Sequence, residues 1–215
     1  MGPAVANVFM ANAHASLNGH PQPLGELREI AKPRIERARA EAAARELLVA
    51  LGVDVEREST SRTPERMVGV YSELLTPVAF EPTTFPNDGG YDELVVARGI
   101  PFHSLCEHHL LPFVGVAHVG YLPGERIVGL SKLARVVEFH ARSLQVQERL
   151  TTQIAEWLRR ELSPKGAGVV IEAEHMCMSL RGVQKPGAST VTSALHGSIR
   201  DDSRTRQEFL ALTGR

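Results

Sequence analysis

The two cysteines of this 215-residue chain constrain its fold most strongly, because each stands beside histidine in a short segment. Residues 106–109 read CEHH, and residues 175–177, far downstream, read HMC. Thiolate and imidazole are ligands that zinc prefers in proteins, and a catalytic zinc site commonly uses three protein ligands. We therefore expect the fold to bring three ligands together around one zinc ion: Cys106, His109 and Cys177.

Other roles for these segments stay open on spacing alone. The thiols could be ordinary buried cysteines, since cysteine is among the most buried residue types. A disulfide is a further alternative, although two cysteines in a chain of this length make no disulfide framework. A closed structural zinc site would need a fourth ligand, which His175 could supply. If three ligands hold the metal, His108 and His175 are free to move protons beside it, because histidine titrates near neutral pH.

Composition argues against two classes of function. The net charge is -1 and aromatic residues make up 5% of the chain, so neither a basic field nor a base-stacking surface for nucleic acid is expected. No apolar run approaches the ~20 residues that a membrane span needs. The first residues lack the basic start and apolar run of a secretory signal. We therefore expect a cytoplasmic protein that binds neither nucleic acid nor membrane.

The order of predicted elements indicates an α+β fold with a mainly antiparallel sheet. Helix formers, capping residues and apolar periods predict helices over residues 35–51, from Thr63, from Ser131, over 144–162 and from Asp202. Apolar and β-branched runs predict strands at 94–100, 113–121, 168–180 and 189–195. Alternate residues of a strand share a face, so the strand from residue 168 should present His175 and Cys177 together.

A second set of residues suits an anion. Ser131 is expected to cap a helix whose free N–H groups attract negative charge, and Lys132 and Arg135 share a face of that helix. Arg181 follows the second cysteine segment, and Arg66 could join from a neighbouring subunit. Together these residues suit a polyphosphate. The alternative for each is an ordinary solvated basic surface.

Gln147 and Glu148 occupy the first turn of the helix predicted over 144–162. A glutamate can accept two hydrogen bonds from an N–H/NH₂ edge such as that of guanine, and a glutamine offers both a donor and an acceptor. The alternative is that Glu148 merely complements the helix dipole.

Several long motifs, taken in order, resemble the GTP cyclohydrolase I family. They are SLCEHHLLPF at 104–113, GLSKLAR at 129–135, LQVQERL at 144–150, HMCM at 175–178 and RGVQK at 181–185. The resemblance runs roughly from Thr63 to the C-terminus. It implies the tunnelling fold, an antiparallel sheet with helices packed on one side and an N-terminal helical extension. We divide the chain into three regions: a flexible arm over 1–30, expected because its first residues are small and polar without a clean period, a helical region over 31–90 and a catalytic domain over 91–215.

The resemblance further implies an activity, in which GTP and water give formate and 7,8-dihydroneopterin triphosphate, the first step of folate or tetrahydrobiopterin biosynthesis. It implies a toroidal homodecamer of two pentamers with active sites between subunits. Position by position, the zinc ligands are Cys106, His109 and Cys177, and the catalytic residues are His108, His175 and Ser131. The residues that hold GTP are Glu148, Gln147, Lys132, Arg135, Arg181 and Arg66.

Two rival functions remain at this point. One is another zinc-dependent tunnelling-fold enzyme of pterins or purines, such as a pyruvoyl-tetrahydropterin synthase, although that family typically binds zinc through three histidines. The other is a non-catalytic scaffold stabilised by zinc, which would complete the coordination with a fourth protein ligand.

Overall fold

The structure is a computed structural model that describes residues 34–214, so the flexible arm expected over 1–30 lies outside the described residues. The N-terminal elements are α1 (Arg37–Ala50), α2 (Thr63–Leu74) and β1 (Thr84–Pro86). The central elements are β2 (Val95–Cys106), β3 (Pro112–Leu122), β4 (Arg126–Val128), α3 (Leu130–Ala141), β5 (Leu144–Gln145) and α4 (Gln147–Leu162). The C-terminal elements are β6 (Gly166–His175), α5 (Met176–Ser179), β7 (Ser189–Gly197), α6 (Ser198–Asp201) and α7 (Ser203–Leu212).

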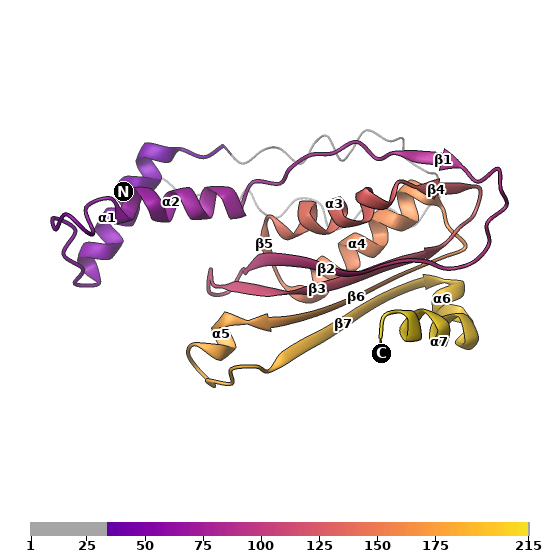
Figure 1. The fold of residues 1–215 in the computed structure, drawn as a ribbon. Helices are drawn as coiled ribbons and strands as arrows, with labels where there is room; N and C mark the ends of the chain where they lie inside the picture. Colours follow the sequence, from indigo (N-terminus) through magenta and orange to yellow (C-terminus); the bar gives the residue numbers. More distant parts are fainter. Residues whose placement is uncertain (1–33, 215) are drawn as a thin grey trace, which may run out of the picture.

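A five-stranded sheet in the order β5-β2-β3-β6-β7 forms the body of the protein (Figure 1). Its long strands β2, β3, β6 and β7 pair antiparallel with their neighbours, and only the short β5 runs parallel to β2. A separate two-stranded sheet joins β1 to β4. The expected α+β fold with a mainly antiparallel sheet is therefore confirmed.

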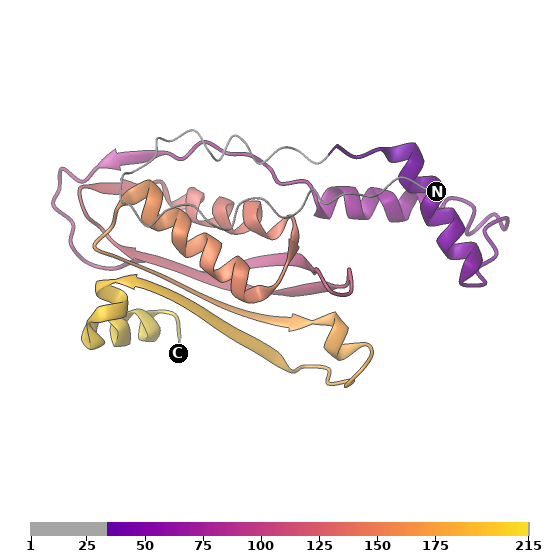
Figure 2. The same ribbon diagram turned by 180° about the vertical axis from the view of Figure 1, so that it is seen from behind.

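Helices α3 and α4 cover one face of this sheet (Figures 1 and 2). In α4 the fully buried Leu150, Ile154 and Leu158 recur every four residues, which places them on one side of the helix. They pack with Trp157 and with the apolar side chains of β3 and β6 in the main core. The metal segments lie at one end of this layered body, where β2 turns into β3.

The short helices α6 and α7 pack against the opposite face at the other end of the sheet (Figure 1). There Phe209 and Ile199 form a small second core with Val170. The ring of Phe209 lies so close to the sheet that a Cβ atom at Gly120 or Gly168 would come within 3.0 Å of it. Glycine at these two strand positions therefore makes room for the C-terminal helix.

Helices α1 and α2 extend beyond the sheet at the end where the metal segments lie (Figure 1). The hydroxyl of Tyr71 in α2 donates to the Leu110 carbonyl at 3.3 Å, and Arg142 donates to the Glu73 carbonyl at 3.3 Å. A hollow of about 400 Å³ between α1 and α2 is lined almost wholly by apolar side chains. In the described part of the chain, no helix combines the length and the apolar composition needed to cross a membrane.

Several predicted boundaries were wrong. The strand expected over 168–180 ends at His175, and Cys177 lies on the helical turn α5 because the chain bends there. The helix expected over 144–162 begins at Gln147, since the two residues of β5 pair with β2 instead. The strand expected over 94–100 continues to Cys106.

Of the three expected helix caps, two were wrong and one is confirmed. Ser131 is not the cap of α3, because Gly129 occupies that position and Ser131 already lies in the first turn. Thr63 likewise lies inside α2, whose cap position is Arg62. The cap expected at Asp202 is confirmed, since its carboxylate accepts a hydrogen bond from the Thr205 backbone N–H at 2.8 Å.

Candidate active site

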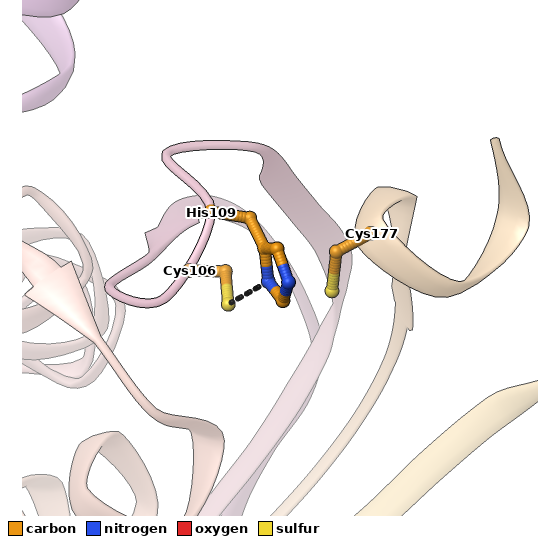
Figure 3. Close-up of side chains that lie close together, drawn as sticks. All are labelled: Cys106, His109 and Cys177. Carbon is orange, nitrogen blue, oxygen red and sulfur yellow. Dashed lines mark hydrogen bonds between the residues drawn. The ribbon is translucent and has the colours of Figure 1, made fainter. Parts of the chain in front are cut away.

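The turn between β2 and β3 presents the first two metal ligands. The Cys106 carbonyl accepts backbone hydrogen bonds from His109 at 3.3 Å and Leu110 at 2.9 Å, which closes a tight turn. Leu110 has a φ of 54°, a left-handed conformation that costs a non-glycine residue of the order of 1 kcal/mol. Because of this turn, Cys106 and His109, three residues apart in sequence, both point to the same side (Figure 3).

The third ligand comes from α5. The Sγ atoms of Cys106 and Cys177 and one ring nitrogen of His109 all lie within 4.8 Å of one another (Figure 3). Cys106 Sγ is 3.8 Å from His109 Nδ1. In tetrahedral zinc coordination such atoms are about 3.5–3.8 Å apart. We call these three residues the metal cluster. Both cysteines are free thiols, which excludes the disulfide alternative in this structure.

The chemistry of the donors in the metal cluster fits a cation. Burial raises the pKa of the Cys177 thiol, and the neighbouring Cys106 raises it further. Two thiolates brought this close together are therefore unfavourable unless a positive charge lies between them. Zinc supplies that charge and takes both sulfur and imidazole ligands. The residues present therefore fit a zinc ion.

His175 lies beside the metal cluster and is held on two sides. Its ring stacks on Phe113, with centroids 4.6 Å apart and an interplanar angle of 4°. Its Nε2 atom is 2.8 Å from Oε1 of Gln147. Burial lowers the pKa of His175, and the charge of Glu148 partly opposes that shift. Since Nε2 is engaged by Gln147 and the residue is absent from the group of ligands found within residues 34–214, His175 does not act as a fourth ligand here.

His108 differs from His175 in its exposure. Its side chain is 63% exposed, and its Nδ1 atom lies 3.7 Å from Cys106 Sγ. The preceding Glu107, for which the sequence suggested no role, accepts a hydrogen bond from Arg149 at 2.5 Å. Arg149 also donates to Oε1 of Gln145 and to the Leu144 carbonyl, so it ties the turn to β5 and α4.

Gln147 and Glu148 begin α4, as predicted, but they face different surroundings. Gln147 is 2% exposed, whereas Glu148 is exposed to solvent beside the site. The amide of Gln147 hydrogen-bonds His175 and the backbone of β6 and β7. Only Glu148 therefore presents its side chain to a ligand.

The chain does not bring Ser131, Lys132 and Arg135 to the metal cluster; we call these three residues the anion set. Their helix, α3, begins next to β4 and runs toward β5 (Figure 1). Its last residue, Ala141, accepts a hydrogen bond from Ser104 at 2.6 Å, two residues before Cys106. Ten residues of helix separate Ser131 from Ala141, a distance of roughly 15 Å at 1.5 Å per residue.

The remaining two arginines lie in different places. Arg181 follows α5, and its Nη1 atom is 3.4 Å from Nε2 of His109, so it reaches the metal cluster. Arg66 is exposed on α2. Among residues 34–214, neither Arg66 nor Lys132 nor Arg135 forms an ion pair.

Sequence reasoning missed the side chains that support the site. Arg149 is 42 residues from Glu107, and Thr192 is 45 residues from Gln147, so no local pattern joins them. One signal was available for Thr192, since the strand over 189–195 alternates and places threonine at inward positions. A polar residue on the inward face of a strand requires a partner.

Comparison with known proteins agrees with the motifs. The family model described as GTP cyclohydrolase I matches residues 40–214. The GTP cyclohydrolase 1 of Mycobacteroides abscessus is 49% identical over 203 residues, which cover 92% of this chain and 95% of that protein. That of Streptomyces griseus is 55% identical over 181 residues (81% and 89%), and that of Aquifex aeolicus is 51% identical over 178 residues (83% and 97%).

Among solved structures, the apo archaeosine synthase QueF-Like aligns with a TM-score of 0.40 and 13% identity, covering 50% of this chain and 94% of that one. The family assignment rests on the family model and on the sequence relatives, which span most of the chain. The chain belongs to the GTP cyclohydrolase I family.

Proposed function

We propose that the metal cluster, His108, His175 and Glu148 of one subunit form an active site with the anion set of a second subunit. As a member of its family, the protein hydrolyses GTP to formate and 7,8-dihydroneopterin triphosphate. The observation that carries the site proposal is the convergence of Cys106, His109 and Cys177 beside a fixed histidine. We place this site in a catalytic domain over 91–215, preceded by a helical region over 31–90.

Zinc, when bound by the metal cluster, supplies a Lewis acid that lowers the pKa of water towards ~7 and so provides hydroxide for attack on C8 of the purine. His175 donates a proton to N7 of the same ring, since it lies beside the metal cluster and its ring is held rigidly. The imidazole ring opens to a formamide, and a second water hydrolyses this formamide so that C8 leaves as formate; the later closure of the pterin ring releases one water.

His108 serves the later steps, in which the ribose opens and rearranges before the pterin ring closes. Its exposed ring beside Cys106 is free to turn toward a substrate and to carry protons between atoms of the sugar. Ser131, from the second subunit, is placed by the same proposal near the ribose. Both assignments come from the positions that match the family motifs.

Glu148 holds the guanine, because its exposed carboxylate can accept two hydrogen bonds from the N1–H and 2-amino groups. Lys132, Arg135 and Arg66, which have no ion-pair partner among the described residues, neutralise the triphosphate together with Arg181. The burial of Gln147 favours a supporting role for this residue over direct contact with GTP.

Sharing of the site between subunits explains why the anion set of one chain lies roughly 9–15 Å along α3 from the helix end nearest its own metal cluster. A ring of subunits places the start of α3 of one copy beside the turn of the next. We therefore propose a homo-oligomer, and the family resemblance favours a decamer of two pentamers. We further propose that the enzyme is cytoplasmic and opens the route to folate or tetrahydrobiopterin.

A direct assay tests this function. Zinc-loaded protein incubated with GTP should release one formate per GTP consumed and give a pterin that fluoresces after oxidation. His108→Ala should retain zinc and lose turnover, whereas His103→Ala, an exposed histidine on the adjoining strand, should keep both. Absence of formate from the zinc-loaded wild type would refute the activity, and full turnover by His108→Ala would refute the role of that residue.

A further inference from the structure

The side-chain amide of Gln147 is enclosed by the protein on every side. Its Nε2 atom lies 2.9 Å from the Thr190 carbonyl, 3.2 Å from the Ile171 carbonyl and 3.1 Å from the Thr192 hydroxyl. Its Oε1 atom lies 2.8 Å from Nε2 of His175. Both amide protons and the amide oxygen therefore have partners inside the protein.

These contacts allow the amide only one orientation. Two of the three groups around Nε2 are backbone carbonyls, which only accept hydrogen bonds. A flipped amide would turn its oxygen toward the carbonyls of Ile171 and Thr190, leaving acceptors against acceptors in a buried place. The oxygen of Gln147 therefore faces His175.

Two threonines extend this arrangement into a closed ring of hydrogen bonds. Gln147 donates to Thr192, whose hydroxyl is 2.7 Å from that of Thr151. Thr151 in turn donates to the backbone carbonyl of Gln147 at 2.7 Å. Because the Thr151 hydroxyl donates its only proton to that carbonyl, the Thr192 hydroxyl must donate its proton to Thr151. The Thr192 oxygen then accepts a hydrogen bond from the Gln147 amide. The direction of every bond in the ring is thereby set.

We propose that Gln147 and Thr192 are positioning residues that fix neutral His175 in the tautomer with its proton on Nε2. This inference rests on the proposed catalytic role of His175 and changes the role expected for Gln147, which then supports the histidine instead of contacting GTP. An amide oxygen accepts only, so the atom opposite it must carry a proton. Nδ1 is left as the bare nitrogen of the neutral ring, so it is the atom that must take up a proton before His175 can donate that proton to N7.

The stacked ring of Phe113 adds the second constraint. It fixes the plane of the His175 ring, while Gln147 fixes its rotation within that plane. A histidine held in both respects keeps Nδ1 in one place throughout the reaction. Loss of the Thr192 hydroxyl would leave Gln147 Nε2 with only the Ile171 and Thr190 carbonyls and would remove its link to Thr151. We expect this loss to loosen the rotation of the His175 ring without removing any group near the metal.

The first test compares steady-state kinetics of zinc-loaded variants. Thr192→Val should lower kcat roughly tenfold, with little change in KM for GTP or in zinc content, because one buried hydrogen bond is lost and no substrate contact changes. Thr192→Ser, which restores the hydroxyl, should recover most of kcat. Thr152→Val is the matched control, because its hydroxyl donates to the Glu148 carbonyl in the same helix without touching the ring.

The second test does not depend on turnover. In zinc-loaded protein labelled with ¹⁵N-histidine, the His175 signals should show a protonated Nε2 and a bare Nδ1 when the ring is neutral. Gln147→Met removes the amide oxygen that accepts from His175 and the amide protons. In this variant the His175 tautomer with its proton on Nδ1 should therefore become populated. A wild-type spectrum with the proton on Nδ1 would overturn the proposal, as would full kcat in Thr192→Val. Failure of the activity itself would appear instead as absence of formate from a wild type with the expected tautomer.

Discussion

The metal cluster and the anion set differ in how much of each is completed within one chain. Cys106, His109 and Cys177 converge, and hydrogen bonds and a stacked ring hold the neighbouring His175. Lys132 and Arg135 lie in the first half of α3 and form no ion pair among the described residues. One chain therefore assembles its metal cluster without help, whereas we propose that polyphosphate recognition there depends on the anion set of a second copy.

The same contrast appears in electrostatics. Around the metal cluster, burial raises the pKa of Cys177 and lowers that of His175, so the fold favours the neutral thiol and the neutral imidazole until a cation binds. In the anion set Arg135 is exposed and Lys132 is half-buried, and the attraction of such charges for phosphate is strong in a closed site and weak in open water. The side chains that the fold holds in place before a ligand binds are thus those of the metal cluster and His175, where we propose that protons are transferred.

The strongest test of the contrast is complementation between two inactive variants. Cys177→Ser should lose zinc and lower turnover on the order of 10³-fold, because the metal is required for the attack on C8. Arg135→Ala disables the anion set instead. If the site is shared, co-expression of the two variants in equal amounts should restore roughly a quarter of the sites, since one in four ordered pairs of neighbouring subunits combines an intact metal cluster with an intact anion set.

Activity measured on the separately purified variants, mixed without subunit exchange, provides the baseline for that experiment. Recovery only in co-expressed oligomers supports a shared site. No recovery in hetero-oligomers whose composition has been verified would mean that each chain uses its own anion set, and the comparison above would fail.

The second prediction concerns His140, which lies in the last turn of α3. Burial, together with the smaller effect of the charge of Arg160, lowers its pKa from 6.5 to about 4. Between these two pH values the unfolded chain binds a proton that the folded chain does not. The contribution of neutral His140 to the free energy of unfolding is therefore fully present above about pH 6.5. It is lost as the pH drops towards 4, by up to about 3 kcal/mol.

Denaturant unfolding at fixed protein concentration between about pH 7 and pH 4 measures this loss. His140→Gln should remove most of the pH dependence in that window, whereas the exposed His103→Gln should leave it unchanged. An identical pH profile for wild type and His140→Gln would show that other groups dominate the acid response.

The third prediction isolates the anion set. Arg135→Ala should lower kcat/KM for GTP roughly 10- to 100-fold, the usual range for loss of one charge-assisted hydrogen bond to phosphate. Zinc content should stay at the wild-type level, because Arg135 lies far from the metal cluster in its own chain. Arg204→Ala, an exposed arginine of α7, is the control for a general effect of surface charge.

Much of this organisation could be predicted from the sequence. The two cysteine segments identified the metal cluster, because zinc chemistry requires few residue types and the chain has only two thiols. Apolar periods placed α3 and α4, and the helix position of Gln147 and Glu148 followed from them. Local signals sufficed wherever a pattern repeats within one element.

The sequence could not predict features that depend on contacts between distant segments. Cys177 was placed on a strand, because nothing local shows that the chain turns into α5 after His175. The direction of the Gln147 amide depends on carbonyls of β6 and β7 that only the folded sheet brings together. The separation of the anion set from the metal cluster likewise follows from the path of α3 across the sheet.

The smallest expected effect concerns the ion pair between Glu107 and Arg149, which joins the metal turn to α4. Both side chains are partly exposed, at 34% and 41%, so the pair is worth only about 0.5–1 kcal/mol. Arg149→Met should therefore weaken zinc binding about two- to fivefold, measured by competition with a chelator. Arg159→Met, which breaks a comparably exposed pair with Glu156 on the same helix, should leave zinc affinity unchanged. Equal zinc affinity in all three proteins would mean that the turn holds its ligands without help from α4, so that the metal cluster is pre-organised by its backbone alone.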